Sequence, residues 1–321
     1  MRIGNLEVLG NVFLAPMAGI TDPPFRKTVQ RFGVSALWTE MISAEGLIKG
    51  RAAFPTMDLG GHTVPTVFQI FGKNPDVMAE AARMVEGRGA AAVDINMGCP
   101  SRKIVKRGAG AALLKDLPLA AAIVRAVRKS VQIPLTVKIR SGWDEKTQNA
   151  PIVARLLESE GADAIVLHSR CRSRLHSGEA SLEMIGEVRR AVGIPVIGNG
   201  GITCEQDATS MIADTQCDGV MVGRGALGRP WLPGRILEHL GHPPAFHRGT
   251  IPLTDVIRDH FFYHLDWWDT RTTIRRMRKH WGWYSKGFSG GTEFRKRIFR
   301  EDDPKRVILS VEDFFGKAVV S

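Results

Sequence analysis

Val93-Asp94-Ile95-Asn96-Met97-Gly98-Cys99-Pro100-Ser101 is a stretch in which an apolar strand runs into a polar loop. The apolar run from Ala90 to Ile95 has the length of a buried strand, and it ends abruptly in Asn, Gly and Pro. Glycine allows close approach of backbone or ligand, and proline stiffens the chain that leaves the loop. The pattern is typical of a strand that ends in a functional loop.

Cys99 is the reactive side chain of this loop. An isolated cysteine is most often a small core residue. Cys99 instead follows a strand end and precedes the basic residues Arg102, Lys103, Lys106 and Arg107. We therefore expect Cys99 to carry chemistry on a negatively charged partner, and the four basic residues to bind that partner.

The composition is that of a globular protein with a basic surplus. The 321 residues are 44% hydrophobic and 24% charged, and the net charge of +11 favours a polyanionic partner. The four cysteines form no CxxC pair, so we expect neither a metal site nor disulfides. We find no signal peptide pattern and no apolar run of the ~20 residues that a membrane span needs. These features predict a soluble, cytoplasmic protein, which we expect to be a monomer.

Short apolar runs alternate with helical stretches along the first 240 residues. The predicted strands are Val12–Ala15, Ala36–Thr39, Thr66–Ile70, Ala91–Ile95, Leu135–Ile139, Ala164–Leu167, Pro195–Ile197 and Gly219–Val222. Eight strands separated by helices predict a parallel sheet, and eight is the number that closes a (β/α)₈ TIM barrel.

The positions of the Gly, Pro, Asn and Cys residues after the strands distinguish a barrel from an open, doubly wound sheet. They follow nearly every predicted strand, as in Pro16 to Gly19, Asn96 to Cys99 and Gly198 to Gly201. An open sheet gathers its site at one switch point, whereas a barrel brings all eight carboxyl ends around one mouth. The distribution therefore favours the barrel.

The connecting and C-terminal segments are predicted to be helical. Asn74 and Asp116 are expected to cap two of the barrel helices. We expect the barrel to occupy residues 1–240, a linker 241–250, and a small all-α domain 251–321, whose first helix starts at a Thr254 cap. Its second helix carries an apolar stripe predicted to pack on the first: Ile274, Met277, Trp281 and Tyr284.

The second half of this helical region is strongly basic. Between Arg271 and Arg300, ten Lys or Arg stand against one acid, Glu293, which gives a net charge of +9. Solubility alone favours mixed charges, so this run indicates a nucleic acid partner rather than a merely solvated face.

Two kinds of signal indicate a phosphorylated ligand at the barrel mouth. The glycine-rich turns Gly198-Asn199-Gly200-Gly201 and Gly223-Arg224-Gly225 follow the last two strands, where barrels commonly bind phosphate. Lys138 lies among apolar neighbours near a strand end, so it needs a partner, either a carboxylate or the polar edge of a cofactor ring. His168 closes the next strand and could bind the same ligand.

Taken together, these residues resemble the tRNA-dihydrouridine synthase family, most closely its bacterial B-type members, along nearly the whole chain. The matching phrases are Ala15-Pro16-Met17-Ala18-Gly19-Ile20-Thr21-Asp22, Asp94-Ile95-Asn96-Met97-Gly98-Cys99-Pro100, Lys138-Ile139-Arg140-Ser141-Gly142-Trp143 and Gly223-Arg224-Gly225-Ala226-Leu227-Gly228-Arg229-Pro230-Trp231. This chain departs from the family pattern at Ser169, where many members have glycine, and at Gly201, where many have an acid. We expect neither difference to affect the chemistry.

The resemblance implies an FMN enzyme that reduces the C5=C6 bond of uridine in tRNA to dihydrouridine, with NADPH as reductant. Hydride from FMN would reach C6, and Cys99 would give a proton to C5, although its basic neighbours could lower the pKa of the thiol. The implied flavin contacts are Pro16, Met17, Ala18, Gln69, Lys138, His168, Asn199, Gly200, Gly201, Gly223 and Arg224. The expected RNA contacts are Arg102, Lys103, Lys106, Arg107, Arg275, Arg278, Lys279, Arg295 and Lys296.

Two other functions remain open at the level of sequence. One is an FMN barrel reductase of a small molecule, similar to dihydroorotate dehydrogenase. The other is a non-catalytic RNA-binding protein on the same scaffold, which the combination of Cys99 and Lys138 disfavours. RNA-dependent turnover and a yellow purified protein would distinguish them.

Overall fold

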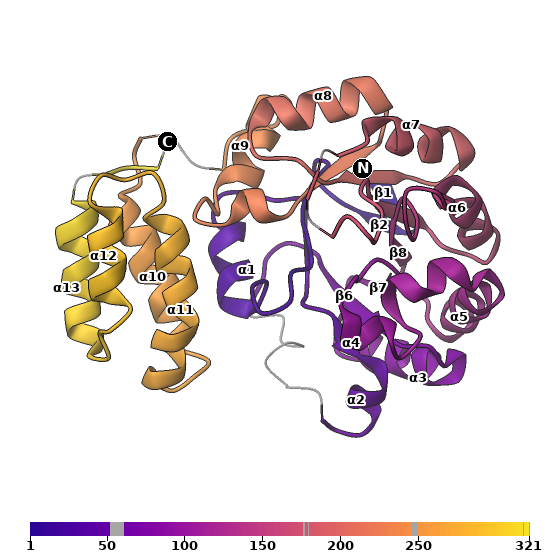
Figure 1. Ribbon diagram of the computed structural model, residues 1–321, viewed down its shortest axis with the longest axis horizontal. Helices are drawn as coiled ribbons and strands as arrows, with labels where there is room; N and C mark the ends of the chain where they lie inside the picture. Colours follow the sequence, from indigo (N-terminus) through magenta and orange to yellow (C-terminus); the bar gives the residue numbers. More distant parts are fainter. Residues whose placement is uncertain (52–60, 176, 179, 246–248, 317, 321) are drawn as a thin grey trace.

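The computed structural model, which describes residues 1–51, 61–175, 177–178, 180–245, 249–316 and 318–320, contains a closed parallel barrel (Figure 1). The ring closes because β4 pairs with β6 as well as with β3, and β5 (Ile42–Ser43) adds a short strand beside β6. The eight barrel strands are β3 (Val12–Leu14), β4 (Ala36–Trp38), β6 (Thr66–Phe71), β7 (Ala92–Asn96), β8 (Leu135–Arg140), β9 (Ala164–His168), β10 (Val196–Asn199) and β11 (Gly219–Val222). The predicted TIM barrel and its eight strands are confirmed.

Helices surround the barrel and connect its strands. They are α1 (Pro23–Gln30), α2 (Ala44–Ile48), α3 (Pro75–Glu86), α4 (Arg102–Val105), α5 (Leu117–Ser130), α6 (Ala150–Ser159), α7 (Leu182–Ala191), α8 (Glu205–Thr215) and α9 (Leu232–His239), with 3₁₀ turns η2 (Gly110–Lys115) and η3 (Arg224–Ala226). Asn74 accepts hydrogen bonds from two backbone N–H groups at the start of α3, and Asp116 accepts one at the start of α5. Both predicted caps are confirmed.

The barrel interior is apolar at the end where the strands begin. A hairpin that the sequence analysis did not identify closes this end. Strands β1 (Arg2–Ile3) and β2 (Leu6–Glu7) pair antiparallel. Ile3 and Val8 beside them are buried in one cluster with the inward-facing residues of the barrel strands. The hairpin therefore stops the amino-terminal end of the barrel, and the carboxyl-terminal end is left for a site.

A bundle of four helices lies to one side of the barrel next to α1 (Figure 1). They are α10 (Leu253–Leu265), α11 (Thr270–Tyr284), α12 (Gly291–Ile298) and α13 (Pro304–Phe315). The predicted stripe on α11 is buried, and Phe261 of α10 packs its ring on Trp281. Phe32 and Trp231 from the barrel side join the same apolar cluster, which attaches the bundle to the barrel.

The predicted start of α10 is wrong. The helix begins at Leu253 behind Pro252, and the Thr254 side chain does not cap it. Pro252 bridges to Val319, and Leu253 N donates to the carbonyl of Ala318, so the returning end of the chain fixes the start of the helix. Residues 246–248 of the predicted linker, and residues 317 and 321 of the predicted helical domain, lie outside the described residues. In the described part of the chain, no helix combines the length and apolar character needed to cross a bilayer.

Candidate active site at the barrel mouth

The inward-facing positions of the strands turn from apolar to polar toward the carboxyl ends. Side chains alternate along a strand, so Ala92, Asp94 and Asn96 of β7 share the inner face. Register pairs Asp94 with Gln69 and Thr136, and Asn96 with Lys138. A polar layer therefore lies directly above the apolar barrel core.

Asp94 is the buried centre of this layer. Its carboxylate accepts hydrogen bonds from Gln69 Nε2 and from Thr136 Oγ1, both at 2.6 Å, and Asn96 Nδ2 donates to Gln69 Oε1 at 2.8 Å. Burial raises the pKa of Asp94, and these two hydrogen bonds and the charge of Lys138 oppose that rise. The network fixes the orientation of the Gln69 amide, a predicted ligand contact. The sequence analysis assigned no role to Asp94.

Lys138 is a buried cation held by an uncharged partner. Its Nζ donates to Asn199 Oδ1 at 2.9 Å, and Asn199 Nδ2 donates to the carbonyl of Met221 at 2.7 Å. Burial, and then the charge of Arg140, lower the pKa of Lys138, and Asp94 raises it. An ammonium has three N–H donors, so the bond to Asn199 leaves it able to bind a ligand.

The Cys99 loop is held from both sides. Asn96 Oδ1 accepts from the backbone N–H of Gly98 at 3.1 Å and of Cys99 at 2.8 Å. On the other side, Arg140 Nε donates to Gly98 O at 2.9 Å and Arg140 Nη1 to Cys171 O at 3.0 Å. These contacts fix the backbone of a half-buried thiol. Neither Asn96 nor Arg140 was among the predicted site residues.

The basic neighbours that could have lowered the pKa of Cys99 do not decide its direction. Burial raises the pKa of the thiol, and a backbone hydrogen bond from Ser101 and the charge of Arg140 oppose the rise. The basic neighbours, Arg102 and Lys103 on α4 and Lys106 and Arg107 after it, are exposed, where solvent screens their charges. Cys99 is therefore a protonated thiol at neutral pH.

The loops after β9, β10 and β11 form a cationic cradle. Gly200 and Gly201 have φ values of +118° and +83°, in the region that favours glycine. The side chain of Arg170 is buried beside Gly200, and its Nη1 has no hydrogen-bond partner among the described residues. Burial, and then the charge of Arg224, lower the pKa of Arg170, so the Arg224 guanidinium is near enough to act on it. An anion between them would relieve both the orphaned donor and the repulsion.

The remaining predicted contacts also lie at strand ends on this mouth. Pro16 and Met17 are half-buried and Ala18 is exposed, in a turn closed by bonds from Ile20 N and Thr21 N to Met17 O. His168 Nδ1 accepts from Arg170 N at 3.2 Å, so its ring is oriented by the cradle. The structure thus brings the predicted cofactor contacts and Cys99 to one end of the barrel.

The family model described as "Dihydrouridine synthase" matches residues 13–318. The chain belongs to the dihydrouridine synthase family. A protein of Rickettsia conorii named "Probable tRNA-dihydrouridine synthase" is 38% identical over 318 residues, 98% of this chain and 96% of the relative. A Pseudomonas putida protein named "tRNA-dihydrouridine synthase B" is 38% identical over 324 residues, 99% of this chain and 95% of the relative.

Solved structures share the fold of this dihydrouridine synthase family member at low identity. A 2-naphthoyl-CoA reductase superposes with a TM-score of 0.60 at 12% identity, over 74% of this chain and 51% of that one. A histamine dehydrogenase from Rhizobium superposes with a TM-score of 0.55 at 13% identity, over 82% and 50%. The match therefore spans about half of each of those longer chains, and it confirms the barrel.

The basic residues of this family member are not all free on one face. Arg275 is exposed, but Arg278 pairs with Asp302 at 2.9 Å, and Lys279 donates to the carbonyl of Gly19 at the barrel mouth. Arg297 pairs with Asp313 at 3.2 Å. The acids that offset the basic run therefore include Asp302 and Asp313 beyond Arg300 and Asp22 near the start of the chain, which a count within the run could not include.

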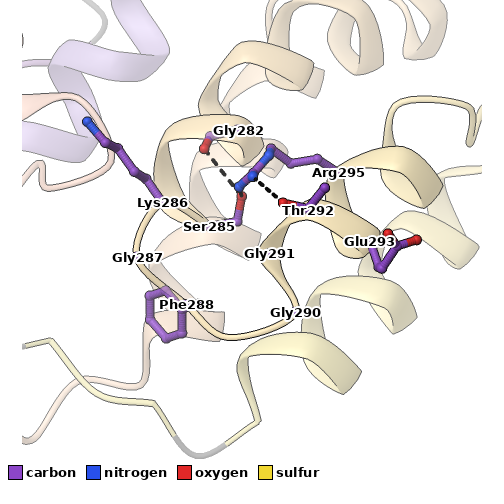
Figure 2. A pocket seen from close by; sticks show the side chains of 10 residues that line it. All are labelled: Gly282, Ser285, Lys286, Gly287, Phe288, Gly290, Gly291, Thr292, Glu293 and Arg295. Atoms are coloured by element: carbon purple, nitrogen blue, oxygen red, sulfur yellow. Dashed lines mark hydrogen bonds between the residues drawn. The ribbon is translucent and has the colours of Figure 1, made fainter.

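A hollow of about 420 Å³ lies where α11 turns into α12 (Figure 2). Arg295 spans it, donating to Ser285 Oγ at 3.2 Å and to Thr292 Oγ1 at 3.1 Å. Lys286 projects from the turn between them, and Gly290 and Gly291 lead into α12. Its lining of donors and glycine suits a phosphate of a polyanion better than an apolar ligand.

Proposed function

We propose that this protein reduces the C5=C6 bond of uridine in tRNA to dihydrouridine, using FMN and NADPH. The relatives are named for this activity, and the site has the parts that it requires. One observation carries the proposal: Asn96, which fixes the backbone of Cys99, is the register partner of Lys138. A protonated thiol and a buried lysine therefore lie together at one mouth.

The residues present fit a phosphorylated flavin. Arg170 Nη1 is a buried donor without a partner among the described residues, and it shares the cradle with Gly200 and Arg224. This cradle would hold the phosphate. Lys138, Gln69 and His168 present polar groups in the adjoining layer, and they would hold the ring. Pro16, Met17 and Ala18 would cover it from the loop after β3.

A flavin held by these residues and reduced by NADPH would supply the hydride that adds to uracil C6. This leaves negative charge conjugated through C5 to the C4 carbonyl, and C5 then needs a proton. Cys99 can provide it because burial keeps its thiol protonated, and because Asn96 and Arg140 hold its backbone in place. The mouth thereby combines a hydride site with a positioned acid.

Uridine within folded RNA must turn out of its stack to reach this mouth, at a cost of a few kcal/mol. Exposed cations would hold the flanking phosphates: Arg102, Lys103, Lys106 and Arg107 on and after α4, and Arg275 on the bundle. The other two predicted bundle contacts are already engaged, since the half-buried Arg295 donates to Ser285 and Thr292 and the exposed Lys296 pairs with Glu293 at 2.8 Å. Arg278 and Lys279 are engaged within the protein and would contribute through the field they add. A tRNA substrate and four free thiols fit the reducing cytoplasm.

The test is mass spectrometry of tRNA from cells lacking the activity, after incubation with purified protein and NADPH. Cys99→Ala should keep bound flavin and oxidise NADPH but form no dihydrouridine. The matched control is Cys217→Ala, because that cysteine is buried just before β11, at the amino-terminal end of the barrel, and its Sγ donates to Gly219 O at 3.3 Å. Normal dihydrouridine yield from Cys99→Ala would reject the role of Cys99, and a wild-type protein that leaves tRNA unchanged would reject the function.

A further inference from the structure

Three histidines meet inside the helical bundle, far in sequence from the barrel site. His260 and His264 are one turn apart on α10, and His280 comes from α11. Each is at most 1% exposed, and one nitrogen atom from each lies within 4.8 Å of the others. Ring centroids are 4.5 Å apart for His260 and His280, and 5.1 Å for His260 and His264.

The cluster leaves an unusual number of buried polar atoms unsatisfied. Native proteins leave few such atoms, because each one loses its bonds to water without replacement. Within the described residues, five imidazole nitrogens here have no hydrogen-bond partner: His260 Nε2, His264 Nδ1, His264 Nε2, His280 Nδ1 and His280 Nε2. A group that binds nitrogen lone pairs would satisfy one of these atoms on each ring, since a neutral imidazole has one lone-pair nitrogen and one N–H.

We propose that His260, His264 and His280 bind a divalent transition metal ion, Zn²⁺, which links α10 to α11. Neutral imidazole is a common Zn²⁺ ligand, and two histidines four residues apart on a helix present their rings on one face. A tetrahedral site with Zn–N of ~2.0–2.1 Å needs nitrogens about 3.4 Å apart, so the rings must converge by about 1 Å. A water molecule would complete the four ligands.

Tyr284 orients the ring of His260, one of the three proposed ligands. Its Oη lies 3.1 Å from His260 Nδ1. If the imidazole donates this bond, its proton is on Nδ1 and the lone pair of the orphaned Nε2 is available to metal. A ligand histidine held in this way by an outer hydrogen bond is the usual arrangement in metal sites. Burial lowers the pKa of all three imidazoles, which is consistent with neutral rings.

The surrounding charges and rings tolerate a cation. Arg276 and Lys279 lie nearby, but Arg276 pairs with Asp22 at 3.3 Å, and both Asp22 and Glu40 act on Lys279. Glu40 therefore offsets part of this positive charge, and Asp22 adds to the offset as the pH rises past its pKa of about 7. Aromatic rings close the cluster: Phe25 of α1 lies within 5.6 Å of His260 and His280, Trp268 is 5.2 Å from His264, and Trp283 is 5.1 Å from His280.

The first test is the metal content of the full-length protein. After loading with Zn²⁺ and extensive dialysis, we expect one tightly bound Zn²⁺ per chain and a melting temperature that falls by a few degrees when a chelator removes it. His264→Gln and His280→Gln should each weaken Zn²⁺ binding at least tenfold. His239→Gln, an exposed histidine outside the cluster, is the matched control and should bind as the wild type does.

The second test does not depend on the variants folding. Co²⁺ added to the metal-free wild-type protein should give the visible absorption of a four-coordinate nitrogen site, without the near-ultraviolet band of a cobalt–thiolate bond. A wild-type chain that retains no metal, a thiolate band, or unchanged binding in folded cluster variants would overturn the proposal. The site is independent of the proposed function, since its readouts need neither flavin nor RNA.

Discussion

Lys138 Nζ and Asn199 Oδ1 are 2.9 Å apart although the strand β9 lies between their own strands, β8 and β10. Two side chains from next-but-one strands meet in this way only if both point into the barrel. The amide carries no charge, so the bond positions the ammonium without neutralising it. Burial and the charge of Arg140 lower the pKa of Lys138 to about 7, and Asp94 opposes this, so a bound ring that carries negative charge would favour the ammonium form and be stabilised by it.

Lys138→Met should weaken flavin binding by about 10- to 100-fold, because a hydrogen bond from a charged group contributes about 1.5–3 kcal/mol. The substitution keeps much of the buried volume and removes the donor. A flavin titration followed by absorbance measures the affinity, and Lys129→Met, on the exposed side of α5, is the control. An unchanged dissociation constant would show that Lys138 serves the fold alone.

The rate of uridine reduction should stay constant as the pH rises past ~8.5, the usual pKa of a cysteine thiol. The acid form of Cys99 is the form required, and burial raises its pKa, so the loss of activity should begin only at higher pH. Single-turnover measurements of product at pH 6 to 10 test this. A decline that begins near neutrality would indicate a thiol pKa lowered by its basic neighbours.

Asn96→Ala should slow uridine reduction by about 10- to 100-fold, because positioning bonds of about 1–3 kcal/mol are lost, with a smaller loss of flavin affinity because the bond from Asn96 to Gln69 is also removed. The variant removes the acceptor for Gly98 N and Cys99 N. Product formation and NADPH oxidation are measured separately. Asn74→Ala, which removes only the cap of α3, should affect stability and leave product formation unchanged.

Replacing Arg102, Lys103 and Arg275 with Glu should weaken tRNA binding and reduce its dependence on salt, because each lost phosphate contact lowers the slope by about 0.7–0.9. Binding isotherms at several salt concentrations measure both quantities. Arg155→Glu is the control, since it is exposed on α6, at the opposite side of the barrel from the bundle (Figure 1). An equal loss of tRNA affinity in the triple variant and in Arg155→Glu would indicate a general effect of net charge.

Asp22→Asn should make stability less dependent on pH. Burial, and then the charge of Glu40, raise the pKa of Asp22 from 3.8 to about 7. The folded state therefore binds this proton more tightly: the contribution of Asp22 is complete below pH 3.8 and is lost as the pH rises to about 7, by at most about 4 kcal/mol. Asparagine still caps α1. The melting temperature of the variant, relative to that of the wild type, should rise between pH 4 and 8. A difference between the two melting temperatures that does not change with pH would contradict the raised pKa of Asp22.

The sequence predicted the barrel well because each strand is a short apolar run bounded by turn residues, as in Leu135–Arg140. It failed where the determinants are distant in the chain. The β1–β2 hairpin has only two residues in each strand and depends on packing against the barrel. The start of α10 depends on Val319, more than 60 residues away.

The predicted site missed residues whose role lies in supporting others. Asp94 and Asn96 were visible as polar residues at alternate positions in an apolar strand, and a period of two would have assigned both to the barrel interior. Arg170 had no such signal, because its burial depends on the fold of three loops. The histidine cluster combines residues from two helices, and the spacing of His260 and His264 alone did not reveal His280.

The hairpin beneath the barrel also constrains the order of events in turnover. Since Ile3 and Val8 close the lower end, nicotinamide and nucleic acid must enter and leave by the same opening. If the proposed function holds, NADPH and tRNA bind at this opening in turn. Double-reciprocal plots for the two substrates should therefore be parallel, and excess RNA should slow the oxidation of NADPH.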